Sequence, residues 1–351
     1  MESLRKLDPR NKKILVRLDF DVPIKGGTVV DTFRLDAVFE TLKYLEPAKK
    51  LYLIGHANRP EGKVVEDLRL RPQAEYLAQK LGLNFSDRSC KIYEHRYLLG
   101  DRIEILENLR FFKGEEENNE KFAKKYTRLS EIFVFEAFAV SHRKHASIFW
   151  LPKLLPSFLG LRTEKEIIVL SELRNEADQS IALVGGAKAS DKADLILKFK
   201  ALKILLGGKT ASELWLKKGE AKKGNIIFPV DGILENGSTK LYSEMDKAEI
   251  MQVRDIGEKT IIDYSKIFNK EGKNIIFSGP MGQFEKEKFS QGTKKLYQTA
   301  IKSGKNTILL GGDSAYAAEK FKLRDKFSYV SVGGGASLNF LAGGKIFLPL
   351  S

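Results

Sequence analysis

Short runs of apolar and β-branched residues alternate along the chain with amphipathic stretches that have helical spacing. The runs lie at residues 14–20, 51–55, 103–108, 132–138, 181–186, 203–208, 225–230, 274–280, 307–313 and 328–335. Their near-continuous apolarity is typical of strands that are covered on both faces. Regular alternation of strands with helices favours parallel sheets built from right-handed crossovers, so the sequence predicts an α/β fold.

Residues 31–45 illustrate the helical pattern between strands. Apolar side chains recur there at the i, i+3, i+4, i+7 spacing of one buried face, at Leu35, Val38, Phe39, Leu42 and Leu45. Asp31 or Thr32 can cap the start of this predicted helix.

A longer helical stretch at 163–178 separates four predicted strands from six. A chain of 351 residues is also too long for one typical core. We therefore predict two doubly wound parallel-sheet (Rossmann-like) domains joined by a hinge helix. The first spans residues 1–165, and the second spans 166–337 together with the linker helix.

Composition narrows the class of protein. Hydrophobic residues make up 42% and charged residues 30%, as in a packed protein. No apolar run is long enough to span a bilayer, and the start MESLRKLDPRNKK lacks the apolar core of a signal peptide. Cys90 is the only cysteine, which excludes an internal disulfide and fits a reducing cytoplasm.

The formal net charge of +14 suits a nucleic acid, an acidic membrane surface or small polyanionic substrates. The lysines are spread along the chain, and no zinc-finger or RNP-like motif is present. Nucleic-acid binding stays open at this point as an alternative to a small anionic substrate.

The residues that follow the strands separate the two halves, because ligands of open parallel sheets sit beyond the carboxyl ends of the strands. The first half supplies His56, Arg59, Arg110, His142, Arg143 and His145, with Arg34 in the first turn of the capped helix. Guanidinium groups grip carboxylates and phosphates in bidentate geometry. A single arginine in such a place is usually a solvated charge, but several on matching strand ends predict a site for a small anion. His142 and His145 are more simply interpreted as turn residues or supports.

The second half ends its strands in glycines, as in LGGKTAS, SGPMGQFE, LGGDSA and VGGGASL. Glycines let backbone N–H groups at helix N-termini approach phosphates, so this half predicts a polyphosphate site. Gly311, Gly312, Asp313 and Ser314 would hold phosphates and a metal ion, with positive charge from the two lysines of VGGAKASDK. Any single glycine pair can be only a turn. LLGGKT is not a Walker A motif and no G-x-G-x-x-G is present, which disfavours a dehydrogenase.

Eleven segments, taken in order, resemble the successive signatures of phosphoglycerate kinase. They are ILVRLDFDVP, DTFRLDA, GHANRP, ENLRFFKGE, FEAFAVSHRKHAS, VGGAKASDK, FPVD, DIGEKT, FSGPMGQFE, LGGDSA and VSVGGGASL. The resemblance implies a two-domain enzyme of glycolysis that transfers the acyl phosphate of 1,3-bisphosphoglycerate to MgADP, giving 3-phosphoglycerate and ATP. It also implies a hinge closure, a monomer, and a tail (338–351) that packs back on the first domain.

The resemblance assigns 3-phosphoglycerate to the first domain, with Asp19, Asp21, Arg34, His56, Arg59, Arg110 and Arg143 around it. It assigns the nucleotide to the second domain, at Gly186, Lys192, Gly208, Pro280, Glu285, Gly311, Gly312, Asp313 and Ser314. Asp313 would hold Mg²⁺ and Glu285 the ribose. Arg34, Lys188 and the helix N-terminus at Gly334 would flank the transferring group.

The chain departs from the family pattern in several places. Asp21 and Ser278 replace asparagines, Phe135 and Glu136 replace an Asn-Asp pair, and KTASELWL (209–216) replaces a different helix sequence. An ionised Asp21 accepts hydrogen bonds but cannot donate one, which would weaken binding of an acid. The changed helix motivates an alternative: a protein that kept the fold and binds or regulates with weak or altered turnover.

Overall fold

The computed structural model describes residues 1–88, 95–186, 189–217 and 224–349, without the side chains of 189–192. The chain divides into two compact units. Unit 1 comprises Met1–Ile168 and Ile346–Ser351, and unit 2 comprises Val169–Lys345.

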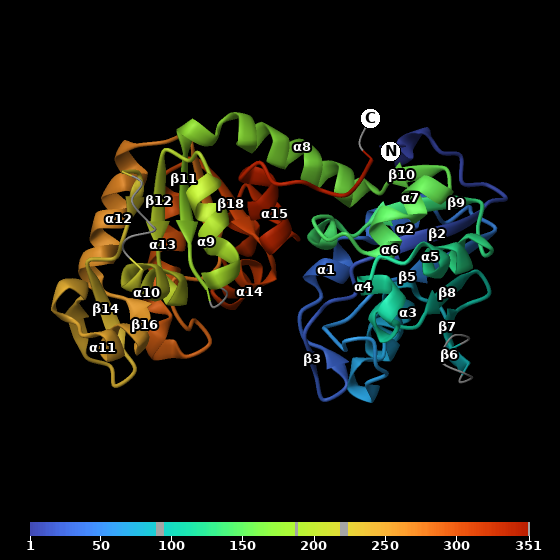
Figure 1. Cartoon of the computed structure of the whole chain (residues 1–351), viewed down its shortest axis with the longest axis horizontal. Helices are drawn as coiled ribbons and strands as arrows, with labels where there is room; N and C mark the ends of the chain where they lie inside the picture. Colours follow the sequence, from blue (N-terminus) through green and yellow to red (C-terminus); the bar gives the residue numbers. More distant parts are fainter. Residues whose placement is uncertain (89–94, 187–188, 218–223, 350–351) are drawn as a thin grey trace. The chain divides into compact units, whose positions relative to one another are not determined.

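Unit 1 contains an eight-stranded sheet in the order β1-β10-β9-β2-β5-β8-β7-β6 (Figure 1). The strands are β1 (Glu2–Ser3), β10 (Ser157–Leu159), β9 (Ile132–Glu136), β2 (Lys13–Leu18), β5 (Lys50–Ile54), β8 (Ile103–Leu106), β7 (Arg96–Leu99) and β6 (Phe85–Arg88). Neighbours from β1 to β8 are parallel, whereas β7 and β6 pair antiparallel. A short hairpin, β3 (Ile24–Lys25) and β4 (Thr28–Val29), lies outside this sheet.

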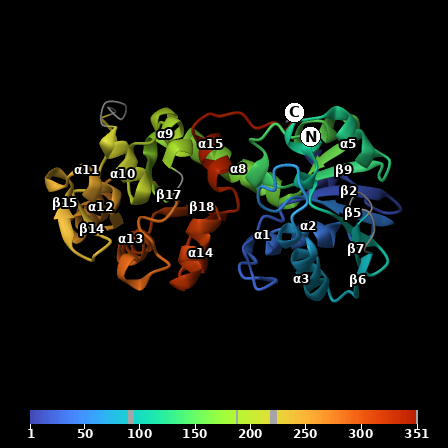
Figure 2. The same cartoon turned by 60° about the horizontal axis from the view of Figure 1, so that its bottom comes forward.

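Helices cover both faces of this sheet. They are α1 (Phe33–Asp36), α2 (Phe39–Tyr44), α3 (Arg71–Leu81), α4 (Lys113–Glu116), α5 (Glu120–Thr127), α6 (Ala146–Phe149) and α7 (Leu151–Leu154). Figure 2 shows α2 and α3 on one side of the sheet and α5 on the other. Alternate residues of β2 enter the two cores, since Ile14 and Val16 pack on the α2–α3 side and Leu15 packs on the α5 side.

Unit 2 contains a parallel six-stranded sheet in the order β13-β12-β11-β17-β18-β19. The strands are β13 (Ile226–Ile227), β12 (Lys203–Leu206), β11 (Ser180–Val184), β17 (Asn274–Ser278), β18 (Asn306–Leu310) and β19 (Tyr329–Ser331). The helices are α9 (Ala189–Lys198), α10 (Gly208–Leu216), α11 (Lys247–Met251), α12 (Glu258–Lys270), α13 (Gln291–Lys302), α14 (Gly312–Lys320) and α15 (Gly334–Leu341). In Figure 2, α9 lies on one side of the sheet and α13 and α14 on the other.

A second, antiparallel sheet of unit 2 was not predicted. It has the order β15-β14-β16, formed by β15 (Thr239–Leu241), β14 (Asp231–Leu234) and β16 (Val253–Ile256). Trp215 of α10 packs on this sheet's core, with its ring centroid 5.2 Å from that of Tyr242 and 5.4 Å from that of Phe228. The KTASELWL segment therefore serves to dock the small sheet.

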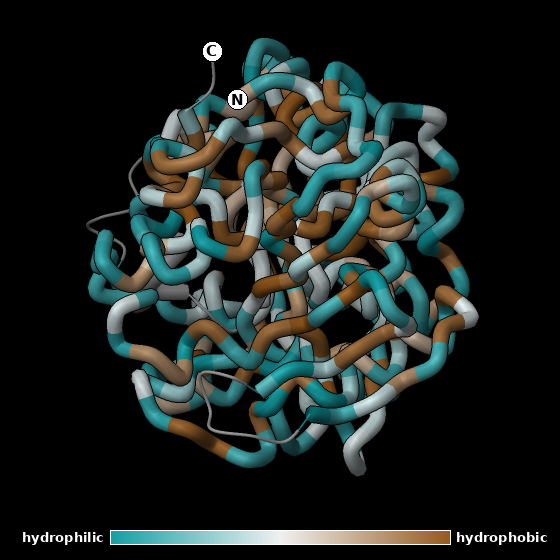
Figure 3. The backbone as a smooth tube through the Cα atoms, turned by 90° about the vertical axis from the view of Figure 1, so that its right-hand side faces the viewer, coloured by the Kyte–Doolittle hydropathy of each residue, from teal (hydrophilic) through white to brown (hydrophobic). Residues whose placement is uncertain are grey.

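The predicted α/β fold with parallel sheets is confirmed, and every predicted strand has a counterpart. Figure 3 shows hydrophobic and hydrophilic stretches alternating along the backbone. The run at 225–230 yields only the short β13, because Pro229 has no N–H to donate to a ladder.

The single helix expected over 31–45 is wrong in one respect: it is broken into α1 and α2. At the break, the N–H of Val38 bonds three residues back to Leu35 O, at 3.4 Å, so the α-helical pattern is interrupted. The predicted buried face is present, with Leu35, Val38 and Leu42 in the core.

The connecting helix α8 runs from Leu161 to Asn175, slightly earlier than the 163–178 expected. The division between the units falls inside it, at Ile168/Val169. The returning tail begins later than expected: residues 338–345 belong to unit 2, because α15 packs there against β18 and α9. From Ile346 onward the chain lies in unit 1, where the N–H of Phe347 donates to Ser141 O at 2.8 Å.

Candidate functional site

The first group of candidate side chains follows four neighbouring strands of unit 1. Asp19 comes after β2, His56 after β5, Arg110 after β8 and Arg143 after β9. Because β9, β2, β5 and β8 are adjacent and parallel, these segments leave the sheet at one edge. That edge is where open α/β sheets bind ligands.

Arg34, in α1, is held beside two carboxylates. Its Nη1 donates to the backbone oxygen of Asp21 at 2.8 Å, and it lies 3.5 Å from Asp19 Oδ2 and 3.8 Å from Asp21 Oδ2. Asp19 is buried, and burial raises its pKa above the ordinary value while Arg34 acts in the opposite direction. The predicted trio of Asp19, Asp21 and Arg34 is thus one connected cluster.

Asn58 joins this cluster to Arg110. Its N–H donates to Asp21 Oδ1 at 2.9 Å, and its carbonyl accepts from Arg110 Nη1 at 2.6 Å. Asn58 has a φ of 53°, in the left-handed region that asparagine tolerates better than most residues. Arg59, the next residue, is exposed, and within the described part of the chain no hydrogen bond or ion pair engages its guanidinium.

Arg17 and Glu115 belong to this region and were missed by sequence reasoning. Arg17 is 1% exposed, with Nη2 at 3.0 Å from His56 Nδ1, and its Nε donates to Ser147 Oγ at 3.1 Å. Ser147 in turn donates from Oγ and N to the buried Glu115 carboxylate, at 2.6 and 3.0 Å. A lone arginine within the apolar run of β2 was the available signal, since a buried guanidinium needs an acidic or hydrogen-bonding partner.

Positive groups are concentrated at this edge of unit 1. Burial lowers the pKa of Arg110 to about 10, with Arg143 contributing. Burial, followed by the charges of Arg110 and Arg143, lowers the pKa of His145 to about 3. Burial, followed by the charge of Arg143, lowers the pKa of His142 to about 4. The pKa of His56 also falls well below its ordinary value, through burial and then Arg17. These pKa shifts keep the imidazoles neutral near pH 7 and mark a site that would be stabilised by an anion.

The histidines give a pH prediction. Their folded-state pKa values lie below the unfolded value of about 6.5, so the unfolded chain binds more protons and stability falls as pH drops below that value. His145→Gln removes one such group. Denaturant unfolding between pH 7 and pH 5 should then show a weaker pH dependence than the parent, by up to about 1.4 kcal/mol per pH unit. Identical slopes for both proteins would contradict this.

The second group of candidate residues follows the strands of unit 2. Gly186 comes after β11, Gly208 after β12, Pro280 after β17, Gly311 after β18 and Gly334 after β19. All five strands run parallel in one sheet, so the turns meet at one edge.

Gly186 and Gly208 bring neighbouring turns into contact, and their own N–H groups are occupied. Gly186 N donates to Pro280 O and Gly208 N to Met281 O, both at 2.8 Å. Gly208 has a φ of 55°, and a Cβ there would lie 3.0 Å from Gly186 N. These glycines shape the edge by close packing.

The N-termini of α14 and α15 adjoin each other. Gly311 has a φ of 87°, and a Cβ there would lie 2.4 Å from the Cα of Gly334. The first N–H groups of a helix have no acceptor within it, so the turns starting at Gly312 and Gly334 provide donors of the kind that bind phosphates. The Ser314 side chain already has a partner within the protein, because its buried Oγ accepts a hydrogen bond from Gly279 N at 2.9 Å.

Asp313 is the acidic residue of the first turn of α14 and is exposed. No group of three or more His, Cys, Asp or Glu side chains that could hold a metal ion occurs among the described residues. One carboxylate beside phosphate donors still fits Mg²⁺, which is usually bound by one or two carboxylates, water and substrate phosphates. Glu285 is exposed on the same unit, and its carbonyl accepts from Lys320 Nζ at 2.7 Å. Lys188 and the side chain of Lys192 lie outside the described residues.

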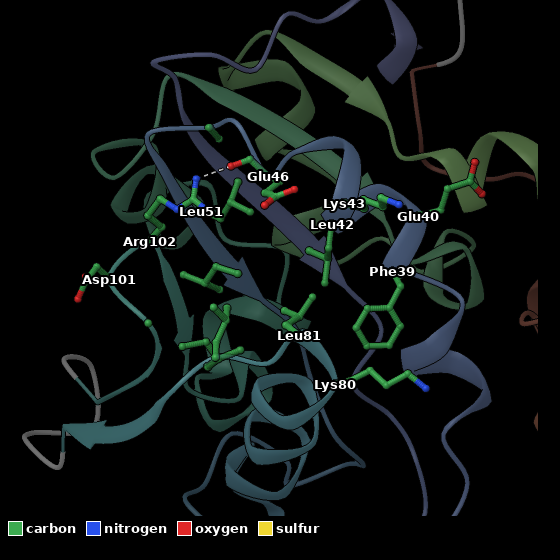
Figure 4. Close-up of a pocket in the computed structure, with 15 residues that line it drawn as sticks. Phe39, Glu40, Leu42, Lys43, Glu46, Leu51, Lys80, Leu81, Asp101 and Arg102 are labelled. Atoms are coloured by element: carbon green, nitrogen blue, oxygen red, sulfur yellow. Dashed lines mark hydrogen bonds between the residues drawn. The ribbon is translucent and has the colours of Figure 1, made fainter.

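A cavity of about 580 Å³ lies in unit 1 at the amino ends of β5 and β8, opposite the edge that carries His56 and Arg110. Figure 4 shows Leu42, Leu51 and Leu81 inside it. Its mouth carries both charge signs, with Lys43, Lys80 and Arg102 against Glu40, Glu46 and Asp101. Nothing in its lining selects one ligand, so the cluster at the carboxyl ends remains the candidate site.

Comparison with known proteins decides the family. The sequence model of phosphoglycerate kinase matches residues 4–219 and 209–344, which together cover nearly the whole chain. The chain belongs to the phosphoglycerate kinase family. It is a kinase, a phosphotransferase of glycolysis that binds ATP.

Relatives of the phosphoglycerate kinase family match the chain from end to end. A phosphoglycerate kinase from Finegoldia magna is 37% identical over 384 residues, covering 97% of this chain and 96% of the relative. A crystal structure of the enzyme from Pyrococcus horikoshii has a TM-score of 0.83 at 28% identity, covering 99% of this chain and 97% of that one. A structure from Coxiella burnetii has a TM-score of 0.75 at 29% identity, covering 98% and 97%. Neither nucleic-acid binding nor a purely regulatory role is favoured by these matches.

The described residues include no helix with the length and apolarity needed to cross a membrane.

Proposed function

We propose that unit 1 binds 3-phosphoglycerate, that unit 2 binds MgADP or MgATP, and that the acyl phosphate passes between them when the units close. The observation that carries this proposal is the gathering of Arg34, Arg110, Arg143 and His56 at one edge of unit 1. The glycine turns of unit 2 form a second edge with a different chemistry.

Unit 1 suits a substrate that has both a carboxylate and a phosphate. Arginine is the cation best matched to either group, because its planar fork donates two parallel hydrogen bonds. Arg59 is exposed and available, whereas Arg34 is oriented by Asp19 and Asp21. The Asp21 carboxylate lies 3.8 Å from Arg34 and accepts from the N–H of Asn58 at 2.9 Å, and these contacts reduce the repulsion expected between its negative charge and an anionic substrate.

Unit 2 suits a polyphosphate. The first turns of α14 and α15 present backbone donors side by side, and their helix dipoles favour negative charge. Lys188 and Lys192 would add positive charge, and Glu285 would take the ribose. The roles of Gly186, Gly208 and Pro280 would be to leave room for the nucleotide. Ser314 would contribute its backbone N–H.

Magnesium would be held by Asp313 and the nucleotide phosphates, where it supplies charge neutralisation for the transferring group. The chain's own contribution is position and charge. Arg34 and Lys188 would neutralise the equatorial oxygens, and the N-terminus of α15 at Gly334 would face the same group. Closure would exclude water that could otherwise hydrolyse the acyl phosphate.

A coupled assay tests the proposal. Purified protein with 3-phosphoglycerate, Mg²⁺ and ATP should form ADP, and omission of 3-phosphoglycerate should abolish this. A parallel series with GTP and ITP measures base preference, which the altered helix at 209–216 leaves open. Binding of both substrates without turnover would overturn the proposal in favour of a non-catalytic protein. We also propose that the protein acts as a cytoplasmic monomer, which sedimentation would check.

A further inference from the structure

The start of the connecting helix α8 is capped by two side chains that are distant in sequence. Glu136 ends β9 and is 3% exposed. Its Oε1 accepts from the N–H of Arg162 at 2.9 Å, and its Oε2 accepts from the N–H of Thr163 at 2.8 Å. Thr41 Oγ1, in α2, accepts from the N–H of Leu161 at 2.9 Å and donates to Glu136 Oε1.

This arrangement satisfies donors that a helix normally leaves open. The first N–H groups of a helix have no acceptor within it and are usually capped by the residue just before the helix. In α8, the first three N–H groups bond instead to the sheet and to α2. Gly160 is required for this approach, since a Cβ there would lie 2.4 Å from the Glu136 carboxylate.

The carboxylate is suited to this position on electrostatic grounds. A negative charge at a helix N-terminus is favoured by the helix dipole. Burial raises the pKa of Glu136, and its bonds with Thr41, Thr163 and Arg162 act in the opposite direction. A buried carboxylate without hydrogen-bond donors would be strongly destabilising. Glu136 therefore depends on all three of its donors, from Thr41, Arg162 and Thr163.

We propose that Glu136 and Thr41 are positioning residues for phosphoryl transfer, which fix the first turn of α8 rigidly on unit 1. The helix continues past Val169 into unit 2. With Leu161, Arg162 and Thr163 held, bending during closure is confined to the part of α8 beyond this turn. This inference rests on the closure invoked in the proposed function.

Three variants test the anchor. Thr41→Val keeps the shape and removes the hydroxyl, Thr41→Ser restores it, and Glu136→Gln replaces one acceptor oxygen with an amide donor. Asp231→Asn is a matched control, because buried Asp231 caps α12 within unit 2 by accepting from the N–H of Thr260 at 2.9 Å and of Lys259 at 3.1 Å.

Amide hydrogen exchange gives the direct readout. Exchange at Arg162 or Thr163, whichever N–H faces the new amide group, should be at least about fivefold faster in Glu136→Gln than in the parent, because that donor loses its acceptor. Thr41→Val should accelerate exchange at Leu161 similarly, and Thr41→Ser should return it to the parent rate. Unchanged exchange in both Glu136→Gln and Thr41→Val would overturn the anchor.

Steady-state kinetics separate positioning from mere stability. In the folded Thr41→Val and Glu136→Gln proteins, kcat should fall by about tenfold while the KM values for 3-phosphoglycerate and ATP stay within about twofold. Asp231→Asn should lose thermal stability but keep the parent kcat. Faster exchange with an unchanged kcat would overturn the positioning role. Failure of the proposed function is distinguishable, since the parent protein itself would then show no turnover.

Discussion

Arg34→Ala should lower kcat by roughly 10³-fold while MgADP binding stays at the parent level. The guanidinium lies at the carboxyl-end edge of unit 1, with Nη1 3.5 Å from Asp19 Oδ2 and 3.8 Å from Asp21 Oδ2. Phosphoryl transfer depends on neutralising the equatorial oxygens, and alanine leaves that charge uncompensated. Single-turnover kinetics with saturating substrates measures this step without product release.

Two further variants serve as an intermediate case and a control for Arg34→Ala. Arg34→Lys keeps the charge but loses the planar fork, so its kcat should lie between those of Arg34→Ala and the parent. Arg102→Ala removes an arginine at the opposite end of the unit 1 strands, where Nη1 donates to Glu46 O at 2.6 Å, and should leave kcat unchanged. Near-parent turnover in Arg34→Ala would contradict the assigned role of this residue.

The fold was predictable where local pattern decides it. Continuous apolar runs become the parallel strands, and side chains that follow them meet at one edge because parallel strands share a direction. The grouping of Asp19, Arg34, His56 and Arg110 follows from that rule, as does the meeting of the glycine turns in unit 2.

What the sequence left out depends on contacts between distant residues. Thr41 and Glu136 are 95 positions apart, and no local sequence pattern predicts that together they cap α8. Arg17 lies within an apolar strand and finds Ser147, 130 positions away, in the fold. The KTASELWL segment was interpreted as a departure from the family's helix sequence. In the fold its Trp215 packs against Tyr242, in the core of a small sheet whose short strands carry a weak pattern.

The departures from the family pattern therefore have different structural reasons. Glu136 is explained by its buried bonds to α8, and Trp215 by packing. Asp21 faces Arg34 and Asn58, so its charge is already compensated within the protein. A negative charge at this position is compatible with binding an acid, because Arg34 lies 3.8 Å from the Asp21 carboxylate and the N–H of Asn58 donates to it.

Asp313→Asn should weaken MgADP binding by about 10- to 100-fold and leave 3-phosphoglycerate binding within about twofold of the parent. Asp313 is exposed in the first turn of α14, the position at which a carboxylate can reach a cation beside phosphates held on helix N-termini. The amide keeps the size and one oxygen of the side chain but removes the charge. Calorimetric titration with ADP, with and without Mg²⁺, measures the effect.

The magnesium dependence distinguishes metal binding from a general effect on the helix. Free ADP should bind Asp313→Asn at least as well as the parent, because removal of a negative charge reduces repulsion of the phosphates. Glu319→Gln is the matched control: it removes a carboxylate from the same helix, where Glu319 pairs with Arg324 at 3.2 Å, and should leave MgADP affinity unchanged. Equal losses for MgADP and 3-phosphoglycerate in Asp313→Asn would show that the two substrates are not divided between the units, because a charge change confined to α14 would then affect both.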